Sequence, residues 1–210
     1  VGTPAIPLQR SEAARLLATA FELRHAKPKV LKHGPCKDVI KRFDVQVTRT
    51  DPWPAAPLVS GTSSGTSADA PTLLDLPILK CWPNDAGRFI TLMQVITRDP
   101  ISNARNVGMY RLQVLSENKL AMHWQRHKGG AEHERKAREL VGAGLAPAPA
   151  QKIPCAIVLG GDPASMWCAS APLPPNIDEY LLAGWLRGKP VEFVKCLTQP
   201  IEVPANAEII

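Results

Sequence analysis

The feature that most constrains the fold is a hairpin pattern near the middle of the chain. Residues 107–115 are rich in β-branched, aromatic and long apolar side chains, and residues 119–126 have the same character. The three residues between them, Ser116, Glu117 and Asn118, favour a turn. We therefore predict two antiparallel strands joined by a tight turn.

The predicted hairpin carries more charge than a strand pair buried in a core would tolerate. Its second half ends in a cationic segment, which is followed by Gly129 and Gly130. Polar groups on an otherwise apolar ribbon indicate a functional site rather than plain core packing. The cationic or ionisable positions are Arg111, His123, Arg126, His127 and Lys128.

The segment His127 to Gly130 has the chemistry of an anion site. A cation followed by two glycines lets backbone N–H groups converge on an anion, and a predicted helix follows at once. The phosphate of a cofactor would fit there, although a simple glycine turn before a helix is the alternative. A second pair, Gly160 and Gly161, does not indicate a dinucleotide fold, because GxGxxG is missing and Asp162 would repel a pyrophosphate.

One candidate metal set combines an amide, an imidazole and a carboxylate: Asn106, His127 and Glu179. A mostly oxygen shell with one nitrogen suits Mn²⁺ or Mg²⁺ better than Zn²⁺. Each member also has a plainer interpretation. His127 fits a surface histidine at a strand end, Asn106 fits a turn residue, and Glu179 lies three residues after Asn176, which is capping-box spacing.

Arg111 lies inside an apolar strand, where an unpaired guanidinium would be very costly. It could hold a carboxylate through two parallel hydrogen bonds, or reach solvent from a strand edge. Strict alternation puts Asn106 and Arg111 on opposite faces of the strand. Both can serve one site only if Asn106 lies in the preceding turn or Gly108 marks a bulge.

The remaining pattern mixes strands and helices, which suggests an α+β fold with a barrel-like sheet. Residues 51–70 are rich in Pro, Ala, Ser, Gly and Thr, so we interpret them as a solvated linker. At the turn after residue 159, Asp162 can cap a helix whose first residue is Pro163. We expect further helices over residues 11–25, 131–141 and 176–187, and strands over residues 39–40, 45–47, 88–97, 154–159, 191–197 and 201–203.

Composition narrows the class of protein further. The chain has 210 residues, of which 45% are hydrophobic, and this suits one large domain or one and a half. It contains neither an 18-residue apolar run nor a signal peptide, and its first residue is not Met, which hints at a fragment or a processed product. The five cysteines are unpatterned, as in cytosolic proteins with reduced thiols. The net charge of +6 favours anionic ligands, but without a clustered basic face it does not predict nucleic-acid binding.

Several motifs occur in a consistent order along the second half of the chain. They are NVGMYRLQV at 106–114, NKL at 118–120 and HKGG at 127–130, joined by LPILKCWPNDAG at 76–87, LGGDPAS at 159–165, APLPPNIDEY at 171–180 and VKCLTQPIEVPANAEI at 194–209. In these motifs the chain resembles the UbiD family of decarboxylases, which includes 4-hydroxy-3-polyprenylbenzoate decarboxylase and related aryl and acrylic acid (de)carboxylases. The resemblance covers most of residues 73–210 and is faint before them.

The resemblance implies a split β-barrel of the flavin-reductase-like kind with inserted helices. It also implies prenylated FMN (prFMN) as cofactor, with Mn²⁺ and often K⁺. The family's metal ligands fall on Asn106, His127 and Glu179 of this chain. Its flavin contacts fall on Met109, Tyr110, Arg111, His123, Trp124, Gln125, Lys128 and Gly129, and Arg111 would also hold the substrate carboxylate.

The activity implied is decarboxylation of an aromatic or α,β-unsaturated acid, with the cofactor as electron sink. 4-Hydroxy-3-polyprenylbenzoate decarboxylation in ubiquinone biosynthesis is one such reaction. The family's proton-donating acids lie beyond the end of this sequence, so we expect a chain truncated at both ends that is inactive alone. The expected parts are an N-terminal remnant (1–50), a linker or insertion (51–72) and the prFMN-binding domain (73–210).

The same resemblance implies partners and a location. A flavin prenyltransferase would supply the cofactor, the full-length protein would be a homo-oligomer, and the enzyme would be cytoplasmic, or peripheral to a membrane if its substrate is polyprenylated. The alternative from another class is a non-catalytic flavin- or phosphate-binding fragment, or one part of a split enzyme.

Overall fold

The strands of the computed structural model form three small sheets, and the residues it describes are 27–38, 71–145, 153–174 and 177–210. Within these ranges the sheets stay open and no closed barrel forms, so the fold is mixed α+β. The first sheet is β1 (Lys29–Val30), β8 (Glu192–Lys195) and β9 (Glu202–Pro204), the second is β2 (Phe89–Ile90), β5 (Leu112–Ser116) and β6 (Lys119–Met122), and the third is β4 (Arg105–Gly108), β3 (Met93–Arg98) and β7 (Cys155–Leu159).

Within the described ranges, three α-helices and two short 3₁₀ helices connect the strands. They are α2 (Gly129–Gly142), α3 (Pro163–Cys168), α4 (Glu179–Arg187), η2 (Pro35–Lys37) and η4 (Leu73–Asp75). The predicted start of α3 is confirmed, because the Asp162 carboxylate accepts a hydrogen bond from the Ala164 amide and Pro163 is the first helical residue. No helix in the described ranges is both long and apolar enough to cross a membrane.

The predicted hairpin is partly right. Strands β5 and β6 pair antiparallel around a two-residue turn, as the Glu117–Asn118 chemistry predicts. The first strand, however, does not run unbroken from residue 107 to residue 115. It stops at Gly108 and resumes at Leu112 in a different sheet, so residues 109–111 carry the chain from one sheet to the other. The second strand ends at Met122 rather than at Arg126.

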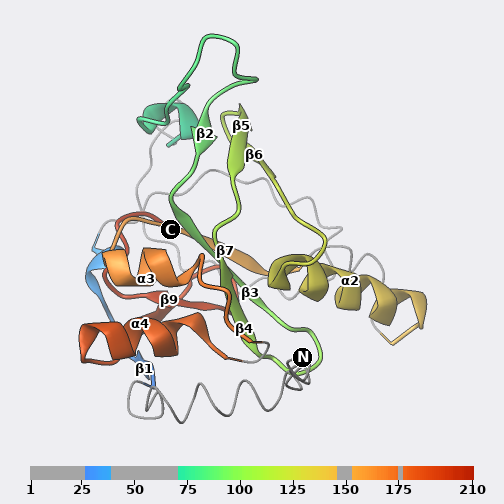
Figure 1. Ribbon diagram of the computed structural model, residues 1–210, viewed down its shortest axis with the longest axis vertical. Helices are drawn as coiled ribbons and strands as arrows, with labels where there is room; N and C mark the ends of the chain where they lie inside the picture. Colours follow the sequence, from blue (N-terminus) through green and yellow to red (C-terminus); the bar gives the residue numbers. More distant parts are fainter. Residues whose placement is uncertain (1–26, 39–70, 146–152, 175–176) are drawn as a thin grey trace, which may run out of the picture.

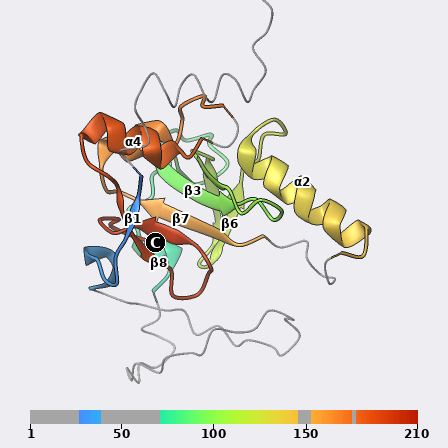
Figure 2. The same ribbon diagram turned by 90° about the horizontal axis from the view of Figure 1, so that it is seen from below.

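Sheet β4-β3-β7 is the centre of the molecule and has helices on both sides (Figures 1 and 2). Directly paired residues of antiparallel strands share a face. The pair Thr97 and Asn106 therefore faces α2, whereas the pair Ile96 and Val107 faces the core that α3 and α4 help to build. This alternation decides which side chains of β4 can reach α2.

Two hydrophobic cores flank this sheet. The larger one lies between the central sheet, the helices α3 and α4 and the sheet β1-β8-β9, and it includes the fully buried Tyr180 and Phe193. The smaller one joins the central sheet to β2-β5-β6 and includes Tyr110 and Leu112. Met109 packs against both cores, so the crossover segment is anchored on each side.

Other predicted elements are confirmed with altered ends. The strand expected over residues 88–97 is split into β2 and β3, which belong to different sheets. Helix α4 begins after Asp178 rather than at Asn176, and Gly188 with φ 67° ends it as predicted. The helix expected over residues 11–25, the strands at 39–40 and 45–47 and the linker at 51–70 lie outside the described residues.

The buried hydroxyl of Tyr180 gives a direct test of the larger core. It donates to the Gln94 Oε1 atom at 3.0 Å, and both side chains are almost fully buried. We expect Tyr180→Phe to reduce the free energy of unfolding by roughly 1–3 kcal/mol, because the Gln94 oxygen is left without a donor. Urea unfolding monitored by circular dichroism measures the change, and an unchanged midpoint would contradict the assignment.

Candidate functional site

Asn106, predicted as a metal ligand, lies on β4 and faces the start of α2. Its Nδ2 atom donates to the Tyr110 hydroxyl oxygen at 3.2 Å, and the Gly130 amide donates to the same oxygen at 3.0 Å. One hydroxyl therefore ties the Asn106 amide to the first turn of α2. Because Nδ2 is engaged, the other end of the amide, Oδ1, is the end left to accept bonds.

Three glycines allow this close approach. A Cβ atom added to Gly129 would lie 1.8 Å from Asn106 Oδ1, and one added to Gly108 would lie 2.2 Å from the Tyr110 ring. At Gly130 the nearest atom would belong to Trp124, at 2.9 Å. Trp124 and Tyr110 are themselves in contact, with ring centroids 5.1 Å apart. The sequence predicts an anion site at Gly129 and Gly130 and, as one alternative, a bulge at Gly108, and the structure shows that all three glycines make room for neighbouring side chains.

The N-terminus of α2 has the donors expected of an anion site. Its N-cap residue, Lys128, makes no side-chain capping bond, and the Gly130 amide is taken by the Tyr110 hydroxyl, which leaves the Gly129 and Ala131 amides of the first turn for a ligand. His127 and Lys128 are both exposed beside it. Nearby, the buried Trp124 Nε1 has no hydrogen-bond partner among the described residues. A buried N–H without an acceptor is costly, so this donor is one that an acceptor could satisfy.

Glu179 is the first residue of α4, but its carboxylate does not cap that helix. Asp178 does so instead, accepting from the Tyr180 amide at 3.0 Å. Glu179 Oε2 accepts from the Val107 amide at 2.9 Å, which is an outward-facing amide on the edge strand β4. Burial raises the pKa of Glu179 to about 8, even though this hydrogen bond favours the charged form. A cation beside it would reverse that shift.

The three predicted metal ligands thus come from three elements that meet at β4. Asn106 packs against Gly129, two residues after His127, and Glu179 bonds to the residue next to Asn106. In the part of the chain that is described, no three His, Cys, Asp or Glu side chains are grouped to hold a metal. The predicted set has only two such residues and depends on the Asn106 amide.

The other predicted site residues lie around the place where these elements meet at β4, and some of them are exposed. Arg111 is exposed in the crossover, where its guanidinium lies 5.0 Å from the centre of the Phe89 ring. The prediction that it lies inside a strand is wrong, because the strand is interrupted there, whereas its side chain does reach solvent, which was one of the two alternatives. His123 and Gln125 are exposed beyond the end of β6, so they do not lie on the second strand that was predicted over residues 119–126.

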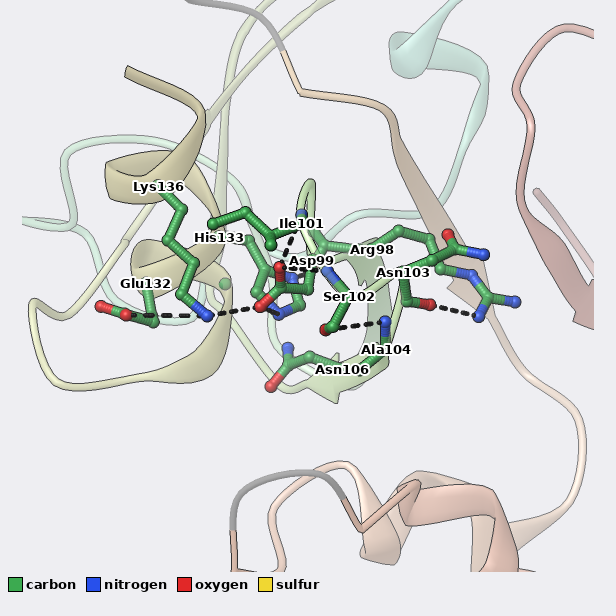
Figure 3. A network of polar contacts seen from close by, with 12 residues as sticks. Arg98, Asp99, Ile101, Ser102, Asn103, Ala104, Asn106, Glu132, His133 and Lys136 are labelled. Atoms are coloured by element: carbon green, nitrogen blue, oxygen red, sulfur yellow. Dashed lines mark hydrogen bonds and ion pairs between the residues drawn. The ribbon is translucent and has the colours of Figure 1, made fainter. Parts of the chain in front are cut away.

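Helix α2 is held on the sheet by a polar network that the sequence did not reveal (Figure 3). Thr97 Oγ1 bonds to His133 Nδ1 at 2.9 Å, and both residues are buried. Asp99 pairs with Lys136 through one oxygen, and with the other it accepts from the Ile101 and Ser102 amides. The network holds α2 against the central sheet, and it thereby helps to place Gly129 against Asn106.

Burial and hydrogen bonding shift two pKa values in this network. Burial alone would raise the pKa of Asp99, but bonds from Lys136 and two backbone amides outweigh it and lower the pKa to about 2. Burial also lowers the pKa of His133, mainly because the imidazolium would be poorly solvated there. The carboxylate is therefore charged and the imidazole is neutral near pH 7.

The geometry brings an amide and a carboxylate side chain to the strand beside the start of α2, and comparison with known proteins assigns the family. The family model described as "UbiD: 3-octaprenyl-4-hydroxybenzoate carboxy-lyase Rift-related domain" matches residues 58–210. The chain therefore belongs to the UbiD family, as its motifs predict.

Two curated relatives are uncharacterized proteins. One, from Aquifex aeolicus (strain VF5), is 44% identical over 206 residues, which is 98% of this chain and 35% of the relative. Another, from Archaeoglobus fulgidus, is 46% identical over 154 residues, which is 73% of this chain and 30% of the relative. The chain thus spans about a third of the length of these relatives.

Solved structures share the fold. An evolved dimeric form of the UbiD-class enzyme HmfF from Pelotomaculum thermopropionicum, in complex with prFMN, matches with TM-score 0.68 and 28% identity over 93% of this chain and 38% of that one. The vanillic acid decarboxylase of Sedimentibacter hydroxybenzoicus in its closed form matches with TM-score 0.66 and 25% identity over 96% of this chain and 37% of that one.

The packing of Gly129 against Asn106 predicts the effect of a single methyl group. Gly129→Ala would place Cβ far inside the contact radius of Asn106 Oδ1, so either the amide or the helix must move. We expect a loss of roughly 1–3 kcal/mol in the free energy of unfolding. Gly142→Ala is the matched control, because the added Cβ meets nothing within 4 Å at the other end of α2. Equal stability of the two variants would contradict this packing.

The Asp99–Lys136 pair predicts a pH dependence. Because the folded pKa of Asp99 is about 2, against 3.8 ordinarily, its carboxylate stabilises the fold above pH 4, and this contribution disappears as pH falls toward 2. We expect Asp99→Asn to cost roughly 1–3 kcal/mol at pH 7 and much less at pH 2. Urea unfolding at both pH values tests this.

The control for Asp99→Asn is Glu134→Gln, which breaks an exposed i,i+4 pair with Arg138 on the same helix. Such surface pairs contribute about 0–1 kcal/mol, so we expect little change from it at either pH. A parallel response of the two variants would show that Asp99 does not anchor α2.

Proposed function

We propose that this chain forms the cofactor-binding wall of a prFMN-dependent (de)carboxylase that acts on an aromatic or α,β-unsaturated carboxylic acid. The observation that carries the proposal is the junction at β4. There the Asn106 amide abuts the uncapped start of α2, and the Glu179 carboxylate bonds to the neighbouring residue. Membership of the UbiD family and the fold shared with HmfF in complex with prFMN support it.

The residues present fit a phosphorylated flavin with a divalent cation. His127, Lys128 and the free amides of α2 would hold the phosphate. Asn106, His127 and Glu179 would bind Mn²⁺, which accepts a mixed oxygen and nitrogen shell, and K⁺ would be a second, weaker ion. The Tyr110 hydroxyl, and the Trp124 Nε1 that has no acceptor among the described residues, are donors suited to an acceptor-rich ring system.

The remaining predicted contacts would line the flavin from the crossover and from the end of the hairpin. They are Met109, Arg111, His123, Gln125 and Gly129. The cofactor, when bound, supplies an electron sink for the bond that loses CO₂. Arg111 is exposed in the crossover, so its guanidinium is free to grip a substrate carboxylate by two parallel bonds.

The full activity would belong to a protein that is longer than this chain. We propose that in it these open sheets become part of a split barrel, with residues 1–50, 51–72 and 73–210 as an N-terminal remnant, a linker and the prFMN-binding domain. A flavin prenyltransferase would supply the cofactor to a cytoplasmic homo-oligomer. Decarboxylation of a polyprenylated benzoate in ubiquinone biosynthesis is one substrate assignment, and it would bring the enzyme to a membrane surface.

A second function, from a different class, is a non-catalytic flavin- or phosphate-binding module or one part of a split enzyme. It is favoured by the fraction of its relatives that this chain spans, about a third. Such a module would bind flavin mononucleotide through α2 without turning over any acid.

Co-expression with a flavin prenyltransferase separates the two functions. We expect the purified protein, extended to the length of its relatives, to carry a flavin-like visible spectrum, to contain Mn²⁺ and to release CO₂ from at least one aromatic or acrylic acid. Bound flavin without CO₂ release from a panel of such acids would favour the module. Absence of both flavin and Mn²⁺ would refute both proposals.

Glu179→Gln tests the metal assignment with a metal-free control built in. Gln keeps an acceptor for the Val107 amide but removes the charge, so we expect Mn²⁺ retention, measured by atomic absorption, to fall at least tenfold. The metal-free variant should melt no lower than the metal-free wild type. Unchanged Mn²⁺ content would show that Glu179 only binds the Val107 amide of β4 and is not a metal ligand.

The same variant should alter the pH profile of the metal-free protein. Because burial raises the pKa of Glu179 from 4.5 to about 8, the folded state binds this proton more tightly, and wild-type stability falls as pH rises through that interval. Glu179→Gln should flatten this part of the profile. A profile identical to that of the wild type would show that Glu179 titrates normally.

A further inference from the structure

Arg105 is the one residue of β4 whose charged side chain enters the larger core. Its side chain is 8% exposed, and its guanidinium lies 4.3 Å from the centre of the Phe193 ring and 5.7 Å from that of Tyr180. A buried guanidinium is tolerated only with good partners. The partners of Arg105 therefore explain how its charge is tolerated in the core.

The first partner is Asp178, the N-cap residue of α4. Arg105 Nη1 donates to Asp178 Oδ2 at 2.5 Å, while the other oxygen of Asp178 caps α4 at the Tyr180 amide. Asp178 thus connects β4 to the helix start with both of its oxygens. The second partner, Glu202 on β9, lies 3.4 Å from Nη2 and also pairs with Arg98.

The ion pair and Glu179 form two adjacent links between the same two segments. Arg105 reaches from β4 to Asp178, and one residue further along α4, Glu179 reaches back to the Val107 amide of β4. Asn106 lies between Arg105 and Val107, with its side chain on the opposite face. The Arg105–Asp178 link therefore supports, from the next position along each segment, the bond that holds Glu179 one residue along β4 from Asn106.

We propose that Arg105 and Asp178 are positioning residues, which hold Glu179 against β4 so that its carboxylate and the Asn106 amide can act on one cation. The proposal deepens the proposed function and rests on it for the identity of the cation. The link itself belongs to the metal-free chain. Neither residue touches the cation: Arg105 sets where α4 begins, and Asp178 transmits that position to its neighbour.

The test compares Arg105→Met and Asp178→Asn with the control Arg98→Met. Asn remains a good N-cap, so Asp178→Asn removes the ion pair while keeping α4 capped. Arg98→Met breaks a pair with Glu202 on the same side of the sheet but leaves α4 untouched. A general loss of stability would affect Arg98→Met as well, whereas loss of positioning would not.

The first measurement needs no metal. Hydrogen exchange of the Val107 amide, followed by NMR, reports its bond to Glu179. We expect exchange to be about tenfold faster in Arg105→Met and Asp178→Asn than in Arg98→Met under the same conditions. Equal protection in all three variants would overturn the proposal, whether or not the protein binds metal.

The second measurement is titration with Mn²⁺ alone, followed by the EPR signal of the free ion. We expect Arg105→Met and Asp178→Asn each to weaken binding by about 10- to 100-fold, as is typical when groups that orient a metal ligand are removed. The double variant should be no weaker than the poorer single variant, because both break one link. Arg98→Met should bind within about twofold of the wild type.

The outcomes separate this proposal from the proposed function. Wild-type protein that binds no more Mn²⁺ than Glu179→Gln would refute the metal assignment, while selective loss of Val107 protection would still establish the link. Tight Mn²⁺ binding by the wild type, Arg105→Met and Asp178→Asn alike, together with its loss in Glu179→Gln, would refute the positioning role.

Discussion

The structure depends on one contact: the Tyr110 ring lies directly against the backbone of Gly108. Because a side chain at residue 108 could not coexist with that ring, glycine allows the chain to leave the central sheet within three residues. Tyr110 then lies against the first turn of α2, and its hydroxyl oxygen accepts hydrogen bonds from the Asn106 side-chain amide and from the Gly130 backbone amide. The crossover, the seating of α2 and the orientation of Asn106 are thus consequences of one aromatic residue packed on glycine.

Each of the three candidate metal ligands is carried by an element with its own anchor. Tyr110 holds Asn106, and the buried contacts of Thr97 and Asp99 with α2 hold the helix that follows His127. Glu179 is held through its bond to Val107. The anchors of Asn106 and of α2 lie on one face of the sheet and share the Tyr110 hydroxyl. The bond that holds Glu179 lies at the edge of β4, so a change at Glu179 need not disturb the other two. Such support suits a site that must keep its geometry.

Local chemistry made much of this predictable. The Glu117–Asn118 turn, the Asp162 cap with Pro163, and Gly188 at the end of α4 all follow from residue types that fix backbone geometry within a few positions. The motif resemblance predicts Asn106, His127 and Glu179 as metal ligands, which stays a prediction, and the structure brings the elements that carry them to one strand. The mixed α+β class follows from the same alternation of patterns.

Sequence periodicity gave wrong or incomplete predictions where contacts between distant residues determine the structure. The apolar run over residues 107–115 is equally compatible with one strand or with two strands in different sheets, because periodicity cannot show which sheet a strand joins. Asp178 was passed over as a helix cap in favour of Asn176, which matched a spacing rule. Arg105 carries no local signal, since its partners lie 73 and 97 residues away. The Thr97–His133 bond was invisible for the same reason.

The bond between Glu179 and Val107 has a consequence for ion selectivity. One carboxylate oxygen is already committed to a backbone amide, so a cation at this position would meet Glu179 through a single oxygen. Calcium favours many oxygens and often takes a carboxylate by both of them, whereas smaller divalent ions accept one oxygen from each of several groups. At the proposed metal site, the hydrogen bond from the sheet edge would therefore favour smaller divalent ions over calcium.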